Sequence, residues 1–231
     1  MHIPDGFIDT PVAVAAGAVA VAGVAVAIKK APKEIDEKRA PLAGLVAAFI
    51  FAVQMLNFPV AVGTSGHLLG GVLAAVLVGP WTGMLCVSLV LFVQGLVFAD
   101  GGLSALGLNV VNMGLIGAVG GYWVFRAIRG ILPANKAMVV IAAGVAAGIS
   151  VVMASIGFWV EYLLGGTTDV ALETVFVAMV GTHALIGIGE GLITGLTIGA
   201  VLAVRPDLVF GAQDLVPGLT VSPGALTAGR S

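Results

Sequence analysis

Charged residues are scarce in this sequence of 231 residues. Asp, Glu, Lys and Arg together make up 10% of it, whereas 59% of the residues are hydrophobic and the mean hydropathy is +1.14. A soluble domain has about 25% charged residues, so this chain has too few to cover a surface that faces water. The composition excludes a soluble globular protein and predicts a membrane protein.

Cysteine is almost absent, and enzyme motifs are missing. The single cysteine, Cys86, lies inside an apolar run, which excludes a disulfide framework and a cysteine-rich metal site. No Gly-x-x-x-x-Gly-Lys-Ser/Thr phosphate loop occurs, so the chain cannot hydrolyse ATP through such a loop. No catalytic triad or pair of carboxylates indicates another reaction. We therefore predict a protein that is not an enzyme, holds no cofactor and takes energy from partner subunits.

Signs of a removable signal peptide are missing as well. No positively charged segment precedes the first apolar run, and no small-residue cleavage site follows it. We therefore expect Met1 to remain the first residue of the working protein.

Apolar runs and glycine are abundant. The 34 glycines suit close contact between helices in a membrane, and a helix crosses the hydrocarbon with about 20 mostly apolar residues. The third run below is too short to cross alone. The predicted fold is an all-α membrane protein with about seven transmembrane helices, at Pro11–Ile28, Pro41–Phe58, Leu68–Val78, Gly83–Phe98, Leu106–Phe125, Ala137–Val160 and Val175–Val204.

We predict one transmembrane domain over residues 1–205, because this length needs only one. Residues 206–231 follow as a cytoplasmic tail, whose Gly and Pro residues predict irregular backbone.

The basic residues indicate the orientation, because cytoplasmic connections are enriched in Lys and Arg. Five of the ten basic residues fall between Lys29 and Arg39. With an outside N-terminus and seven crossings, the other five also lie on the cytoplasmic side, and the opposite connections carry acidic charges only. We predict a multi-pass protein of a prokaryotic plasma membrane, with its N-terminus outside and its C-terminus in the cytoplasm.

Polar side chains gather at the outer ends of the predicted spans. Such residues are costly inside a membrane and are functional candidates. This end also holds the N-terminal segment, residues 1–9, so we predict a polar pocket that opens outward. The polar residues predicted there are Gln54, Asn57, Ser65, His67, Gln94, Asp100, Asn109, Asn112 and His183.

Met1 and His2 together offer a metal chelate. The terminal amine and the imidazole have ordinary pKa values of about 8 and about 6.5, so both lose their protons near neutrality. The Met1 amine and the His2 amide nitrogen close a five-membered ring around a metal, and the His2 amide and Nδ1 close a six-membered ring. Three nitrogens then lie in one plane.

A fourth nitrogen from His67 would complete a planar site, and planar nitrogen ligation favours Ni²⁺ or Cu²⁺. Loss of the amide proton argues against Mg²⁺, Ca²⁺ and Mn²⁺. The alternative interpretation of His67 is structural: its side chain would cap or hydrogen-bond the backbone of its own glycine-rich loop. Ligand imidazoles need oriented partners, and the candidates for that role are Asn57, Ser65, Gln94 and His183.

Three other interpretations stay open. His183 and Glu190 share a helix face, and a structural hydrogen-bonded pair is a stronger interpretation of them than metal ligation. Haem ligation by His67 and His183, as in a b-type membrane redox protein, belongs to a different functional class. A metal permease that works alone is a further possibility.

Several motifs resemble the NikM/CbiM family, the substrate-binding S components of energy-coupling-factor transporters for nickel and cobalt. The resemblance covers residues 1 to about 205. The motifs are Met-His-Ile-Pro-Asp-Gly at residues 1–6, Gln-Met-Leu-Asn-Phe-Pro at 54–59, Gly-Thr-Ser-Gly-His-Leu-Leu-Gly at 63–70, Phe-Ala-Asp-Gly-Gly at 98–102 and Gly-Thr-His-Ala-Leu-Ile-Gly at 181–187.

The resemblance implies a six-helix S-component core with one extra N-terminal helix. It implies Ni²⁺ or Co²⁺ as the transported ligand, held by the Met1 amine, the His2 amide and imidazole, and His67. Cobalt delivery for cobalamin synthesis is the alternative within this family. The implied partners are a transmembrane coupling subunit, ATP-binding subunits and a small accessory membrane subunit.

Overall fold

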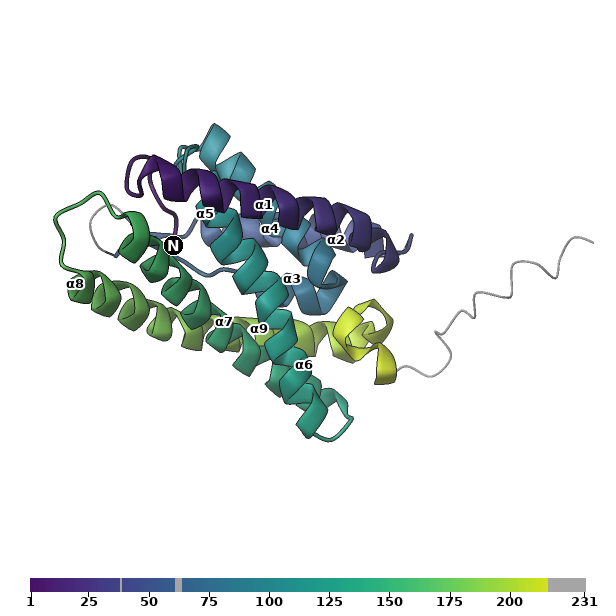
Figure 1. The fold of residues 1–231 in the computed structure, drawn as a ribbon. Coiled ribbons are helices and arrows are strands. Elements are labelled where there is room, and N and C mark those ends of the chain that lie inside the picture. The colour runs from purple at the N-terminus through teal and green to yellow at the C-terminus, as the bar shows by residue number, and fades with distance from the viewer. Residues whose placement is uncertain (38, 61–63, 216–231) are drawn as a thin grey trace, which may run out of the picture.

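The computed structural model describes residues 1–37, 39–60 and 64–215, and these are almost entirely helical (Figure 1). A two-stranded antiparallel sheet pairs β1 (Phe58–Pro59) with β2 (Ser65–Gly66). The α-helices are α1 (Thr10–Lys30), α2 (Arg39–Gln54), α3 (Gly71–Val78), α4 (Pro80–Val97), α5 (Leu106–Asn109), α6 (Gly121–Ile131), α7 (Lys136–Gly165), α8 (Leu172–Phe176) and α9 (Thr182–Val204). The π-helices are η2 (Val110–Gly120) and η3 (Val177–Gly181), and the short 3₁₀ segments are η1 (Ala31–Lys33), η4 (Pro206–Leu208) and η5 (Phe210–Leu215).

The predicted all-α membrane fold is confirmed, and each predicted span corresponds to a helix or a continuous helical run. Two of them contain a π-helix, because α5, η2 and α6 form one run and α8, η3 and α9 form another. By length and composition, five helical runs among the described residues can cross a membrane. The helix α2 has 16 apolar-rich residues, and α3 has only eight.

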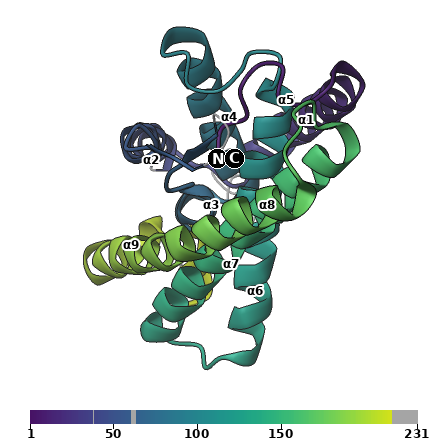
Figure 2. The ribbon, with the colours of Figure 1, turned by 90° about the vertical axis from the view of Figure 1, so that its left-hand side faces the viewer.

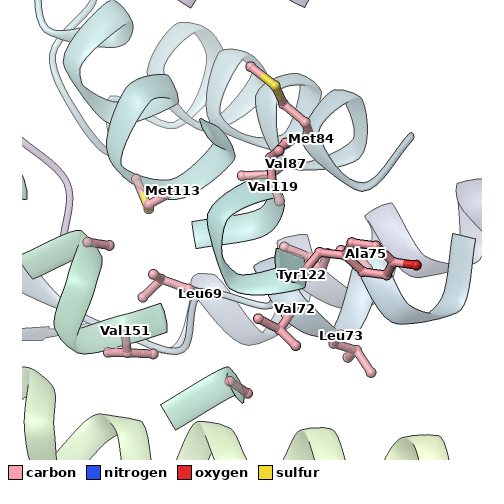
Figure 3. Packing of buried hydrophobic residues seen from close by; sticks show 14 of the residues in the cluster. Leu69, Val72, Leu73, Ala75, Met84, Val87, Met113, Val119, Tyr122 and Val151 are labelled. Carbon is pink, nitrogen blue, oxygen red and sulfur yellow. The ribbon is translucent and has the colours of Figure 1, made fainter. Parts of the chain in front are cut away.

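The short helix α3 lies at the centre of the molecule (Figures 1 and 2). All of its residues are buried, since α4, η2, α7 and α9 surround it. Gly79, with a φ of 101°, ends α3, and Pro80 then begins α4. Figure 3 shows Leu69, two residues before α3, between Met113 of η2 and Val151 of α7. A helix of this length spans about 12 Å, so α3 is a core element and is too short to cross the membrane alone.

Helices α7 and α9 pack against each other through glycine. A Cβ added to Gly144 would lie 2.8 Å from the Gly191 carbonyl, and one added to Gly148 would lie 3.0 Å from the Gly187 carbonyl. The two backbones approach so closely because these four positions carry no side chain. This contact holds α9 in place beside the loop that precedes α3.

Residues 206–215 form two short 3₁₀ segments that are separated by the extended Val209, and η5 is kinked at Ala212. The backbone there is more ordered than expected, but it is not a continuous helix. The 3₁₀ segment η5 packs beneath α3 and α6, with Gly211 against Val76 and Phe125. Residues 216–231 lie outside the described residues, as do Lys38 and residues 61–63, which include Gly63 of the predicted loop.

Candidate metal centre

The first nine residues enter the molecule at the end where α1 begins, and in Figure 2 the N-terminus lies among the helices. The Ile3 N–H donates to Asn109 Oδ1 over 2.9 Å, and the Gly102 N–H donates to the Ile3 carbonyl over 2.8 Å. Met1 is fully buried and His2 is 3% exposed. The terminal amine is therefore held inside the protein.

His67 reaches the same place from the turn between β2 and α3. Its ring stacks on the His2 ring, with 4.4 Å between the centroids and 28° between the planes. Its Nδ1 donates to the Leu68 carbonyl over 2.9 Å. Because a carbonyl only accepts, Nδ1 carries the proton, and a neutral ring then has its lone pair on Nε2. Within the described residues this buried Nε2 has no hydrogen-bond partner.

Burial favours the uncharged form of these nitrogens. It lowers the pKa of the Met1 amine well below its ordinary value, although Asp100 opposes the shift. It lowers the pKa of His67 well below the ordinary value too, and the neighbouring amine and His2 add to that shift. The pKa of His2 is lowered mainly by burial, against the opposing effect of Asp100. Deprotonated amine and imidazole groups are the forms that bind metals.

Polar side chains surround the His2 ring. Its Nε2 lies 3.2 Å from Gln94 Oε1, and its Nδ1 lies 3.2 Å from Asp100 Oδ1 and 3.5 Å from Ser65 Oγ. Asn57 Nδ2 donates to the other oxygen of Asp100 over 2.8 Å. A cavity of about 260 Å³ lies over this group, lined in part by Asp5, Ser65 and Asp100. The cavity gives a small cation a route to His2 between carboxylates.

The structure brings together most of the residues predicted for the site. Met1, His2 and His67 adjoin one another, Ser65 and Gln94 contact the His2 ring, and Asn57 reaches it through Asp100. The ring of His183 makes its hydrogen bond elsewhere.

His183 and Glu190 do not form the hydrogen-bonded pair that their spacing suggested. His183 Nδ1 donates to the Met179 carbonyl over 2.7 Å, while Glu190 accepts from the backbone N–H groups of Leu69 and Gly70. The two side chains share a helix but have different partners, so this interpretation is wrong.

Two residues take roles at the site that the sequence did not predict. Asp100 is one of the expected outer polar residues, but its contact with His2 was not expected. Burial raises the pKa of its carboxyl, but His2 and the Met1 amine outweigh that effect and the net shift is downward. Asn109 holds the backbone of Ile3. The sequence signal for Asp100 is the Ala-Asp-Gly-Gly motif, which favours a turn. In the structure, Ala99 has a φ of 52° and Gly101 has a φ of 90°.

Side chains alone do not form a metal site in the described parts of the chain. No group of three or more His, Cys, Asp or Glu residues there is arranged to hold an ion. A site that uses His2 and His67 therefore needs ligands of another kind, and the buried terminal amine is one such group.

Comparisons with known proteins agree with a transport role. Residues 2–208 match the family model described as CbiM, the cobalt uptake substrate-specific transmembrane region. A cobalt transport protein CbiM of Sorangium cellulosum is 32% identical over 239 residues, which cover 97% of this chain and 100% of that protein. A fused nickel transport protein NikMN of Rhodobacter capsulatus is 38% identical over 117 residues, covering 51% of this chain and 34% of that protein.

A solved structure has the same fold. It is described as the crystal structure of a truncated transition metal transporter, and its TM-score with this chain is 0.80 at 32% sequence identity. The likeness covers 88% of this chain and 99% of that one.

Proposed function

The chain belongs to the CbiM/NikM family of cobalt and nickel transport membrane components, and from that membership we propose that it is the substrate-binding S component of an energy-coupling-factor transporter. It is a multi-pass membrane component of a transporter and not an enzyme, which sets aside the haem redox alternative. In the proposed role it captures Ni²⁺ from outside the cell for ATP-dependent uptake.

The proposed ligands are the Met1 amine, the His2 amide nitrogen, His2 Nδ1 and His67 Nε2. The observation that carries this proposal is the lone pair of His67 Nε2, which is buried, unpaired among the described residues and next to the His2 ring. A buried acceptor without a partner costs about 1–3 kcal/mol. A bound metal removes that cost.

Metal binding at His2 requires a change of tautomer. Nδ1 faces the Asp100 carboxylate in this structure, so it carries a proton there. When Nδ1 binds the metal, the ring proton moves to Nε2. The Nε2–H group then donates a hydrogen bond to Gln94 Oε1, which lies 3.2 Å away. Gln94 thus orients the ligand, and we propose supporting roles for Ser65, Asn57 and His183.

Nickel is the proposed cargo because four planar nitrogens suit it, and such sites bind Ni²⁺ more tightly than Co²⁺. Cobalt is the second candidate, since a relative is named as a cobalt transport protein. In that case the chain would supply cobalt for cobalamin synthesis.

The proposed orientation puts the metal centre outside and the basic residues in the cytoplasm. Lys136, at the start of α7, donates to the Leu202 carbonyl near the end of α9, and Arg129 pairs with Asp214. These contacts gather basic residues at one end of the molecule. At the other end of the molecule, where α1 begins and α7 ends, the Asp9 N–H donates to the Gly165 carbonyl.

We propose the same domain and partners as the sequence suggested. The S-component domain covers residues 1–205, with residues 1–9 as its metal-binding segment, and residues 206–231 form the cytoplasmic tail. The partners are a transmembrane coupling subunit, ATP-binding subunits and a small accessory membrane subunit. They supply the ATP hydrolysis for which this sequence has no phosphate loop.

Titration of the purified protein with Ni²⁺ and Co²⁺ against a competing chelator tests the proposal. His67→Ala should weaken nickel binding by more than the roughly 10- to 100-fold that loss of an outer-shell partner costs. His183→Ala is the control and should cost no more than that range. Unchanged nickel affinity in His67→Ala would refute the ligand set, and tighter cobalt binding by the wild type would assign the cargo to cobalt.

A further inference from the structure

Glu190 is a buried carboxylate that the proposed ligand set does not use. It lies in α9, is 2% exposed, and binds a backbone segment more than a hundred residues earlier in the chain. Its Oε2 accepts from the Leu69 N–H over 2.8 Å and its Oε1 accepts from the Gly70 N–H over 2.7 Å. Both oxygens accept, as an ionised carboxylate does.

The segment that Glu190 holds leads from His67 into α3. The first N–H groups of a helix have no partner within the helix, and side chains near the start usually bind them. Here the N-cap is Gly70 and the next residue is Gly71, so no local side chain is available. A carboxylate from another helix takes that place, and its charge is favourable at a helix N-terminus.

Close packing explains why these two positions are glycine. A Cβ on Gly70, whose φ is 74°, would collide with the side chain of Ile50. A Cβ on Gly71 would lie 2.9 Å from the backbone of Gly117 and Ala118. The close packing thus leaves the capping of this turn to a residue from elsewhere in the chain.

A second side chain binds the same turn, from a residue that precedes the turn in the chain. Gln54, at the end of α2, donates through Nε2 to the Leu69 carbonyl over 2.7 Å. The peptide groups that follow His67 are therefore fixed by α2 and α9 together. The His67 ring bonds the Leu68 carbonyl within this turn, so the direction of Nε2 depends on the backbone that Glu190 holds.

We propose that Glu190 is the positioning residue for His67, which it aims at the N-terminal chelate by fixing the Leu69–Gly70 backbone. Glu190 does not touch the metal and acts through His67. This inference rests on the proposed function, because it takes His67 as a ligand.

The test compares nickel binding in Glu190→Gln, His67→Ala and the double variant. The substituted amide group offers an N–H where the backbone needs an acceptor, so the turn loses one of its two bonds. Glu190→Gln should weaken nickel binding roughly 10- to 100-fold, and its nickel absorption bands should shift towards those of His67→Ala. The double variant should bind no more weakly than His67→Ala alone, because both changes remove the same ligand.

Glu161→Gln is the matched control, because Glu161 is another buried glutamate on a long helix and accepts from Asn112 Nδ2 over 2.6 Å. It should leave the nickel spectrum unchanged. An unchanged spectrum and affinity in Glu190→Gln would overturn the inference, and so would losses that add in the double variant. If Glu190→Gln does not fold, Glu190→Asp keeps the charge, shortens the side chain by one methylene and permits the same comparison.

Hydrogen exchange separates this inference from the proposed function. If the wild type binds no nickel, or if His67→Ala binds it as well as the wild type, the ligand set is wrong. Hydrogen exchange at the Leu69 and Gly70 amides then still tests whether Glu190 fixes this backbone. Glu190→Gln should speed exchange at these two amides, and unchanged exchange would contradict a positioning role.

Discussion

At the scale of single residues, burial favours the uncharged form of the nitrogens that we propose as metal ligands. An exposed terminal amine has a pKa of about 8 and is mostly protonated at pH 7. Burial lowers the pKa of the Met1 amine and that of the His67 imidazole well below their ordinary values. Both groups are bases, so a lowered pKa means that they lose their protons at a lower pH. A metal then displaces fewer protons from these two groups than it would from exposed ones.

The number of protons released on binding follows from this. We predict that at pH 7 to 9 only the His2 amide loses a proton when nickel binds, so nickel affinity should rise about tenfold per pH unit, which corresponds to about one proton. Isothermal titration in buffers with different ionisation enthalpies counts the same proton. A release of two protons near pH 7 would show that the amine is still charged.

At the scale of secondary structure elements, the two central helices start with carboxylates that come from distant parts of the chain. Glu190 binds the turn before α3, and Glu34 accepts from the N–H groups of Trp81 and Thr82 in the first turn of α4. The Glu34 carboxyl reaches α4 because Gly79, between the two helices, has no side chain. The break between α3 and α4 therefore depends on this glycine.

Gly79→Ala should destabilise the protein. Its φ of 101° is unfavourable for alanine, and the added Cβ would collide with the Glu34 carboxylate. A residue held in such a conformation costs about 1–3 kcal/mol, so the thermal unfolding temperature in detergent should fall. Gly44→Ala in α2 is the control, since a Cβ there meets nothing within 4 Å. An equal unfolding temperature in both variants would contradict the role of Gly79.

The sequence predicted the elements better than their contacts. Apolar length located the helices from Pro11 to Val204, and the short run before Gly79 was correctly predicted to be unable to cross alone. The π-helices η2 and η3 have no such signal, because local hydropathy is the same in an α-helix. Glu190 and Glu34 were not predicted as caps, because their partners are neighbours only after the helices have packed.

The site could be predicted only in part, again because some of its contacts form only after the chain has folded. The chelate proposed for Met1 and His2 follows from covalent geometry and needs no fold. The contact between His2 and Asp100 requires two loops far apart in the sequence to meet, so spacing alone could not reveal it.

At the scale of the whole molecule, the proposed metal centre and the described basic residues lie at opposite ends of the helices. The proposed coupling subunit needs a surface on which it can dock. The helix α2 presents an exposed face that includes Ala48, between the exposed side chains of Leu45 and Phe49. Small residues such as alanine allow another helix to approach closely.

Ala48→Leu should stop ATP-dependent nickel uptake in proteoliposomes that contain all subunits, because the larger side chain would separate the two proteins. Nickel binding by the isolated chain should not change. Ala18→Leu, on the exposed side of α1, is the control and should leave uptake intact. If Ala48→Leu lost metal binding, or if it transported normally, α2 would not be the docking surface.

Native mass spectrometry of a preparation that mixes free and N-formylated chains tests the central claim most directly. The formyl group converts the Met1 amine into an amide and leaves every side chain as it was. We predict that nickel is retained by the free-amine form and is absent from the formylated form in the same spectrum. Equal nickel occupancy of the two forms would contradict a metal centre built on the terminal amine.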